Sequence, residues 1–336
     1  MIEKTMIDCE LLQIINEEKG CLLVKAIERQ NIEAMQFLIK SGADIYEPLN
    51  YNEVPPVGLV FKLTGVDNDE FICKFLELIA DITREDCYQN NLLHYACMYN
   101  HPNLVQPLID QGVDVNGRNQ FNGTPLFDAV IDNHFECAAI LLANGAKVNV
   151  NDFDGETPLS CAVSHEDSES VHLLLNHGAN VHSLDNEDQT PLFSAARSSQ
   201  SNMDLLLVNG ADINAVDRDG NTVLLKAIED KFTDNALHLV HHGADINHKN
   251  KMGLTPIFYA LHTKNVECVE ALLNRGADLD IKYGLHAGVK DLVTIDDISR
   301  IAGTAEIYKM ISSYRENKKL SQVIISNIDS CQMPCF

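Results

Sequence analysis

The chain has 336 residues, of which 45% are hydrophobic and 22% are charged, and its 49 Asp plus Glu outnumber its 25 Lys plus Arg. This composition excludes a chain that is disordered throughout, and no apolar stretch approaches the roughly 18 residues of a membrane-spanning helix. The formal net charge of -24 would repel phosphate backbones and anionic lipids. Nucleic acids and membrane surfaces are therefore poor candidate partners.

Residues 1–8 lack the basic start and apolar core of a secretion signal, so we expect a cytoplasmic location. The ten cysteines are scattered, and several lie in apolar periodic stretches, which is typical of reduced thiols in the cytosol. The sequence holds neither a Cys-x-x-Cys pair nor a Gly-x-x-x-x-Gly-Lys phosphate loop. We therefore expect no cofactor and no metal.

A short phrase recurs along the chain. It reads Thr-Pro-Leu-Phe-Asp-Ala at 124–129, and related phrases begin at positions 91, 157, 190, 222 and 255, so that the interval between successive copies is nearly constant. A second phrase, Asn-Gly-Ala-Lys-Val-Asn at 144–149, returns with the same spacing. Two phrases that stay in phase over six copies indicate a protein built from stacked structural repeats.

Both phrases resemble those of ankyrin repeats, which have a period of about 33 residues and a Thr-Pro-Leu-His-x-Ala signature. The resemblance implies an all-α fold, a solenoid of about eight helix-turn-helix repeats with short hairpin tips and a C-terminal pair of capping helices. In chain order we expect an N-terminal helix or cap at 1–15, repeats over 16–282, capping helices over 283–314 and a tail at 315–336. The expected repeats are 16–48, 49–85 (degenerate, with extra residues around 64–69), 86–118, 119–151, 152–184, 185–216, 217–249 and 250–282.

Each repeat carries its own start and stop signals. The Thr that opens the phrase can cap the first helix, and the following Pro suits the first helical position. The second helix, such as 135–143, has apolar residues at helical spacing and stops at a Gly. The next segment, such as Asp-Phe-Asp-Gly at 152–155, predicts a hairpin turn. Because no repeat buries its apolar face alone, neighbours must stack and present a concave surface.

In the ankyrin-repeat family, partners contact the hairpin tips and the exposed end of the first helix. The resemblance therefore implies a non-catalytic, monomeric scaffold for a protein partner that is basic or extended, or that carries an apolar anchor. Binding hot spots favour aromatic residues, although these rings could instead pack on adjacent hairpins. The candidate partner-binding residues are Tyr88, Met98, Tyr99, Phe121, Ile131, Asp132, Phe153, Asp154, Glu156, His165, Glu187, Arg197, Asp219, Glu229 and Asp230.

Acidic residues accompany these positions. Between residues 86 and 282 the chain has 27 acidic and 11 basic residues. Acid along a binding surface would steer a basic segment towards it. The alternative interpretation is that the charge only keeps the protein soluble.

One group of side chains superficially resembles a nucleophilic catalytic site. Cys161 and His165 are four residues apart on a predicted helix, and Asp154 and Glu156 lie nearby. Cys161 falls inside the apolar phrase, so we expect it to point into the core rather than act as a nucleophile.

Three histidines, His238, His241 and His242, suggest a metal site because residues four apart share a helix face. A His before the terminal Gly is common in ankyrin repeats, and no carboxylate or thiolate completes a set in the sequence. We therefore assign these histidines no ligand role.

Three asparagines form a candidate modification site. Asn116, Asn214 and Asn247 each follow an acidic residue and Val or Ile, with a Leu eight positions earlier. They resemble sites in ankyrin repeats that cytosolic asparaginyl hydroxylases modify. The alternative is that each Asn only stabilises its hairpin.

Two other functions stay open. Ankyrin-repeat proteins without further domains include effectors that intracellular bacteria inject into host cells, where this chain would act in the host cytosol. An enzyme or enzyme subunit with a site in the degenerate ends ranks lower, because residues 1–20 and 315–336 are short. In the tail we expect Cys331 and Cys335 to be free thiols, with lipid attachment or a disulfide as alternatives.

Overall fold

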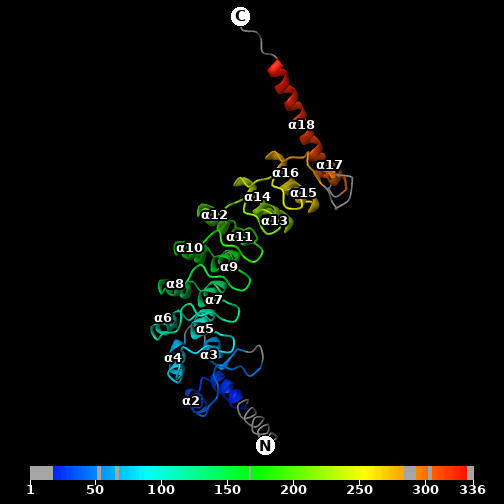
Figure 1. The fold of residues 1–336 in the computed structure, drawn as a ribbon. Coiled ribbons are helices and arrows are strands. Elements are labelled where there is room, and N and C mark those ends of the chain that lie inside the picture. The colour runs from blue at the N-terminus through cyan, green and yellow to red at the C-terminus, as the bar shows by residue number, and fades with distance from the viewer. Residues whose placement is uncertain are drawn as a thin grey trace, which may run out of the picture. The chain divides into compact units, whose positions relative to one another are not determined.

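A computed structural model of the chain describes residues 18–50, 54–64, 68–165, 168–283, 293–301 and 305–330. The expected N-terminal cap at 1–15 and the two tail cysteines lie outside these residues. The chain forms two compact units: unit 1 is Met1–Ala162 with Asp167–Asn180, and unit 2 is Val163–Glu166 with Val181–Phe336. In each unit, helices succeed one another in pairs joined by short turns (Figure 1). The expected all-α repeat fold is confirmed.

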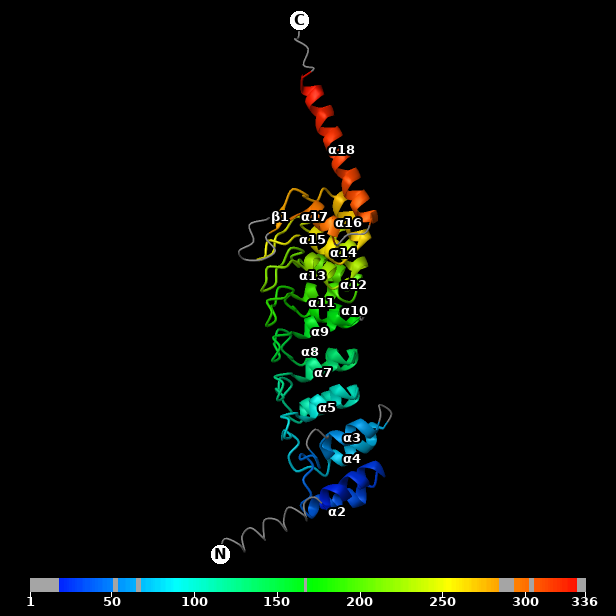
Figure 2. The same cartoon turned by 90° about the vertical axis from the view of Figure 1, so that its right-hand side faces the viewer.

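Unit 1 consists of helix pairs whose turns lie to one side of the helices (Figure 2). The first helix of one repeat packs against the first helix of the next, as α5 does on α7, and also against its own second helix, as α7 does on α8. Unit 1 contains a helical segment at 18–28 and the helices α2 (Ile32–Lys40), α3 (Pro56–Thr64), α4 (Asp69–Leu76), α5 (Leu92–Met98), α6 (Pro102–Asp110), α7 (Pro125–Ile131), α8 (Phe135–Ala143) and α10 (Ser168–Asn176), while α9 (Pro158–Ser164) crosses into unit 2.

Unit 2 continues the pattern and then departs from it. After the last helix pair, β1 (Lys282–Tyr283) and β2 (Val293–Thr294) form a short antiparallel pair in which Lys282 lies opposite Thr294. The sequence did not predict this strand pair. The helices of unit 2 are α11 (Pro191–Ala196), α12 (Gln200–Val208), α13 (Val223–Glu229), α14 (Thr233–His241), α15 (Pro256–His262), α16 (Val266–Asn274), α17 (Ile295–Ile301) and α18 (Ala305–Ser330).

At the start of α5, the side chains of Asn91 and His94 each accept hydrogen bonds from backbone N–H groups. Asn91 Oδ1 accepts hydrogen bonds from the backbone N–H groups of Leu93 and His94 at 3.0 and 3.3 Å, and His94 Nδ1 accepts one from Asn91 N at 3.1 Å. Burial lowers the pKa of His94 to about 4, so this ring stays neutral and keeps its acceptor nitrogen. His94 therefore has a structural role at the start of α5.

The expected threonine caps are only partly present. Thr222 Oγ1 accepts from Leu225 N at 3.3 Å, as a cap should. Thr124 and Thr190 do not cap, because their Oγ1 atoms are buried without a hydrogen-bond partner. At these two repeats the prediction was wrong: each Thr side chain is buried and makes no capping hydrogen bond to its helix.

The second helix of a repeat ends at a glycine, as expected. After α8, Gly145 has φ +86°, a left-handed conformation that an L side chain adopts only with strain. Gly145 N and Ala146 N then donate to the carbonyl oxygens of Leu142 and Leu141 at 3.2 and 3.0 Å. These bonds satisfy the last carbonyls of the helix and turn the chain towards the next tip.

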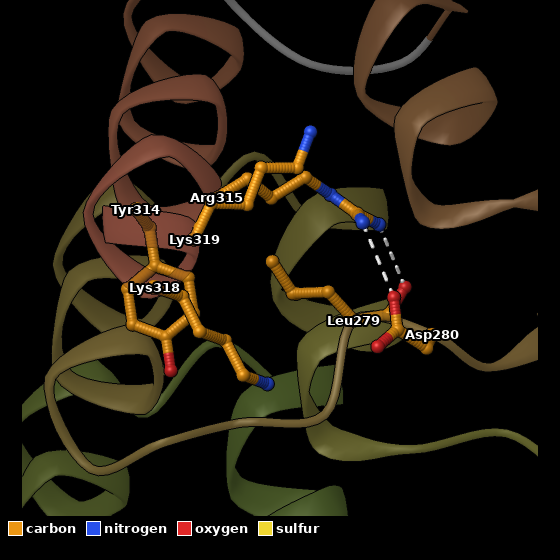
Figure 3. A pocket seen from close by; sticks show the side chains of 6 residues that line it. All are labelled: Leu279, Asp280, Tyr314, Arg315, Lys318 and Lys319. Atoms are coloured by element: carbon orange, nitrogen blue, oxygen red, sulfur yellow. Dashed lines mark hydrogen bonds and ion pairs between the residues drawn. The ribbon is translucent and has the colours of Figure 1, made fainter. Parts of the chain in front are cut away.

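The final helix α18 crosses the boundary that the sequence placed at residue 314, and it continues to Ser330. No Gly or Pro interrupts 305–330, so nothing in the sequence stops the helix at Tyr314. Arg315 instead fastens α18 to the rest of unit 2. Its guanidinium lies 3.1 Å from Asp280, 3.1 Å from Asp296 and 3.0 Å from the Leu279 carbonyl oxygen, beside a small pocket of about 160 Å³ (Figure 3).

Candidate partner-binding site

One Asp or Asn side chain builds the hairpin tip in each of six repeats. In the third repeat, Asp86 Oδ1 accepts hydrogen bonds from the backbone N–H groups of Tyr88 and Asn90, both at 2.8 Å. Such an oxygen accepts hydrogen bonds from the backbone N–H groups two and four residues further along the chain, and these bonds close a tight turn. The residue two positions after the Asp or Asn then lies at the surface. The same pair of bonds recurs at Asn119, Asp152, Asp185, Asp217 and Asn250.

This pattern gives part of the acidic charge a structural role. Asp86, Asp152, Asp185 and Asp217 are occupied by their own turns, so they are less able to bind a partner. The sequence signal was present, since these positions recur with the same period as the two phrases. Five predicted partner-binding residues each lie two positions after such a turn residue: Tyr88, Phe121, Asp154, Glu187 and Asp219.

Neighbouring tips are linked by main-chain hydrogen bonds within each unit. Gln120 N donates to the Tyr88 carbonyl oxygen at 2.8 Å, and Phe153 N donates to that of Phe121 at 3.2 Å. In unit 2, Lys251 N donates to the Asp219 carbonyl oxygen at 3.0 Å. The tips therefore form a continuous ladder in each unit, and the displayed side chains keep a fixed spacing.

A groove of about 320 Å³ opens between the tips and the ends of the first helices in unit 1. Four of the predicted partner-binding residues line it: Tyr88 and Phe121 from the tips, and Met98 and Tyr99 from the end of α5. The complete lining is Val54, Pro55, Tyr88, Asn90, Tyr95, Met98, Tyr99, Asn119, Gln120, Phe121 and Asp128.

The floor of the groove is aromatic. The rings of Tyr95 and Tyr99 are stacked, with planes 1° apart and centroids 6.5 Å apart, and the Phe61 ring also stacks on Tyr95, with 6.2 Å between the centroids. The Tyr95 hydroxyl donates to Asp86 Oδ2, which joins the floor to the tip turn. Phe121 at the rim keeps 64% of its surface exposed. The groove thus combines a rigid aromatic wall with an accessible ring.

A carboxyl group with one buried oxygen also lines this groove. Asp128, on α7, lines the groove, and its Oδ2 is buried without a hydrogen-bond partner in the described structure. Burial raises the pKa of Asp128 well above its usual value, and the negative charge of Asp132 raises it further. The sequence predicted no role for Asp128, which is the fifth residue of the repeated phrase at 124–129.

The other predicted residues of unit 1 lie outside the groove. Ile131 and Phe153 are 45% and 66% exposed, and Asp132 and Asp154 are exposed as well. Glu156 is partly buried and lies beside Cys161, with 3.4 Å between Glu156 Oε2 and Cys161 Sγ.

In unit 2 the predicted residues form a charged rather than an apolar surface. Arg197 Nε lies 3.3 Å from Asp230 Oδ2, and Lys226 Nζ lies 2.7 Å from Glu229 Oε2 and 3.8 Å from Asp230 Oδ1. Arg197 and Lys226 thus already neutralise part of the negative charge of Glu229 and Asp230. The remaining predicted residues of unit 2, which are His165, Glu187 and Asp219, are exposed.

The catalytic interpretation of Cys161 gains no support. The thiol is buried, and burial raises its pKa, as does the neighbouring Glu156 carboxylate. Both effects favour the protonated thiol, whereas a nucleophile needs the thiolate.

The three candidate asparagines all hold neighbouring repeats together. Asn116 Oδ1 accepts from Lys147 N, Asn214 Oδ1 from Asp245 N and Asn247 Oδ1 from Asp278 N, each at 2.8 Å. Each bond joins the second phrase of one repeat to that of the next, whereas the alternative from the sequence placed the role of each Asn within its own hairpin.

No described helix combines the length and the apolar character that crossing a membrane requires. Helix pairs that recur with the period of the sequence phrases, with tips linked by main-chain bonds, define a helical repeat protein. Three copies of the ankyrin-repeat family model match residues 64–152, 145–217 and 201–283. The chain therefore belongs to the ankyrin-repeat family, whose repeats indicate a scaffold for protein–protein interaction.

Two curated relatives share part of the repeat region. One is the transient receptor potential cation channel subfamily A member 1 of Drosophila melanogaster, which is 25% identical over 122 residues, 36% of this chain and 10% of the channel. The other is the ankyrin repeat protein FPV242 of Fowlpox virus (strain NVSL), which is 32% identical over 107 residues, 31% of this chain and 27% of the viral protein. The matched stretch thus spans little of either relative.

Proposed function

We propose that this protein is a non-catalytic scaffold that captures a basic segment of a partner protein, and that the aromatic groove of unit 1 receives one cationic side chain of that segment. The observation that carries the proposal is the position of Asp128. An acidic group with a buried oxygen that has no partner in the described structure lines a groove whose other side chains are aromatic, apolar or uncharged polar ones.

The chemistry of the groove fits a guanidinium better than an apolar anchor. Arg stacks on tyrosine and phenylalanine faces, and its planar fork can pair with a carboxylate at the same time. Tyr88, Tyr99 and Phe121 supply the faces, and Asp128 supplies the carboxylate. A purely apolar side chain would leave Oδ2 of Asp128 buried and unpaired, which costs free energy.

Charge supports the approach of such a partner. The chain has a formal net charge of -24, and a field of this sign speeds the encounter with a basic segment. In unit 2, Glu187 and Asp219 are exposed at the displayed tip position. We propose that these residues, together with His165, Arg197, Glu229 and Asp230, form a second, more polar contact surface.

The test is affinity capture from cytosolic extract with matched tip variants. Phe121 and Met252 occupy the same position in their tips and are 64% and 74% exposed. Phe121→Ala should lower the yield of the captured partner several-fold, whereas Met252→Ala should leave it unchanged. Equal capture by both variants, with intact helical content, would refute the assignment of the groove.

We further propose a monomeric protein in a reducing compartment such as the cytosol. Every cysteine in the described part of the chain is a free thiol, and four of these, Cys97, Cys137, Cys161 and Cys268, are buried. Hydroxylation of Asn116, Asn214 and Asn247 is part of the proposal, and an added oxygen in mass spectra of protein from animal cells would reveal it. The bacterial-effector and enzyme alternatives, and the repeat boundaries, stay predictions of the sequence.

A further inference from the structure

Asp204 on α12, His238 on α14 and His242, which directly follows α14, form a cluster in unit 2, whose two helices are labelled in Figure 1. None of the three is a predicted partner-binding residue. Asp204 Oδ1 lies 2.7 Å from His238 Nε2 and 3.4 Å from His242 Nε2. One ligand atom from each of the three residues lies within 4.8 Å of the others. The sequence placed both histidines on one helix face but offered no third ligand, because Asp204 belongs to the preceding repeat.

The hydrogen bond made by His242 Nδ1 leaves its other ring nitrogen, Nε2, beside a carboxylate oxygen. Its Nδ1 lies 2.9 Å from the carbonyl oxygen of His238, so this nitrogen carries a proton and donates it. A neutral His242 then presents only a lone pair at Nε2, facing the lone pairs of Asp204 Oδ1 at 3.4 Å. Two acceptors at this distance repel each other unless a cation lies between or beside them, and that cation is either a proton or a metal ion.

The three groups match the preferences of a zinc-like ion. Two imidazole nitrogens four residues apart on a helix and one carboxylate oxygen from the facing helix make a common type of three-ligand set. With ligand bonds of about 2.0–2.1 Å, tetrahedral geometry separates ligand atoms by roughly 3.3 Å. The 3.4 Å pair already has this spacing, and the 2.7 Å pair needs a small rotation of Asp204.

The surroundings also suit a bound ion. The hydrogen bond from His242 Nδ1 to the His238 carbonyl is the kind of outer contact that fixes the tautomer and orientation of a ligating histidine. The side chain of His238 is 18% exposed, while those of His242 and Asp204 are 42% and 49% exposed. Solvent can thus reach the cluster, supply the ion and fill the fourth coordination position with water.

We infer that Asp204, His238 and His242 bind a divalent transition-metal ion of the zinc class, which joins the second helices of two successive repeats. The ion replaces the proton between Asp204 and His238 and relieves the repulsion between Asp204 and His242. This site is independent of the groove in unit 1, so the failure of either proposal leaves the other standing.

The experiment is calorimetric titration of the metal-free, reduced full-length chain with zinc chloride. The site variants are Asp204→Asn and His242→Gln, and the matched control is His241→Gln, an exposed histidine of α14 outside the cluster. We expect one binding event that each site variant weakens at least about tenfold, the loss that even outer contacts of a metal site produce. The control should bind like the original chain.

Cysteines could also bind zinc, and a spectroscopic measurement distinguishes the two sources. Cobalt bound at the cluster should show d–d absorption without the thiolate charge-transfer band that Cys21, Cys73 or Cys87 would add. Zinc should also raise the thermal unfolding midpoint of the original chain and of the His241→Gln control, but not that of either site variant. No zinc binding, equal zinc binding by the site variants, or a thiolate band that accounts for all bound metal would each overturn the inference.

Discussion

Arg315 Nη1 lies 3.1 Å from Asp280 Oδ1, and this contact joins α18 to the last residue of the final copy of the second repeated phrase, at 275–280. Two further partners, Asp296 and the Leu279 carbonyl oxygen, lie at 3.1 and 3.0 Å from the same guanidinium. The three contacts connect the final repeat, the start of α17 and the first half of α18. Arg315 therefore belongs to the cap of unit 2 rather than to a tail.

This arrangement predicts the effect of removing the guanidinium. Arg315→Ala should destabilise unit 2 by about 1 kcal/mol, because charged hydrogen bonds contribute more than neutral ones, whereas the exposed part of this contact is screened by solvent. Amide hydrogen exchange should accelerate across α18, since its docking becomes weaker. Lys318→Ala is the matched control, because Lys318 lies one turn further along α18 and is exposed. Equal exchange in the two variants would contradict a clamp at Arg315.

The pKa of Asp128 predicts a pH dependence of stability. Burial raises this pKa in the folded chain above the unfolded value, so folding favours the protonated carboxyl group. At pH values between the pKa of Asp128 in the unfolded chain and its pKa in the folded chain, the folded state keeps a proton that the unfolded state has lost. The stability of the folded state therefore falls as the pH rises through the folded pKa. Asp128→Asn mimics the neutral form, so it should be more stable than the original chain by about 1 kcal/mol or more at pH 8.

The same variant separates stability from binding. The stability difference between Asp128→Asn and the original chain should shrink towards zero at pH values below the unfolded pKa, which urea titrations at several pH values can measure. At neutral pH the variant should bind the captured basic partner more weakly, despite its higher stability, because the carboxylate that pairs with the cation is gone. If the variant were less stable than the original chain by the same amount at every pH, burial would not disfavour the charged form of Asp128.

The repeat architecture could be predicted from the sequence, whereas the sites depend on contacts between repeats. The phrases at 91–96 and 124–129 gave the helix positions, and Tyr88, Tyr99 and Phe121 could be placed near one surface because each occupies a fixed position in its repeat. The environment of Asp128 could not be predicted in this way. Its burial depends on the packing of Tyr95 and Tyr99, which belong to the preceding repeat.

The pair of Asp204 and His238 shows the same limit in unit 2. Their separation along the chain is close to one repeat, so the period does indicate that the two residues are neighbours on successive second helices. Whether they face each other depends on the rotation of each helix about its axis, which the surrounding apolar residues set. The signal in the sequence is that Asp204 and His238 occupy nearly equivalent positions in the second helices of successive repeats.

The hairpin tips connect a structural hydrogen bond to partner binding. Asn119 Oδ1 accepts from Phe121 N and Gly123 N, each at 3.0 Å, and it thereby holds the Phe121 ring at the rim of the groove. Asn119→Ala removes both bonds and should destabilise unit 1 by roughly 1–2 kcal/mol, since two amide groups lose their acceptor. Asn119→Asp keeps an oxygen at the same place and is the matched control. Four of the six tips use Asp in this position.

The two substitutions should also differ in partner capture. Because the Asn119→Ala tip no longer fixes Phe121, capture should fall several-fold even at temperatures where the variant is fully folded. Asn119→Asp should retain both the tip and the capture, and its added negative charge near the groove should speed association with a basic segment at low salt. Surface plasmon resonance on the captured partner at two salt concentrations would measure both effects. If Asn119→Ala bound as tightly as the original chain, the position of Phe121 would not matter for binding, and the tip would serve the fold alone.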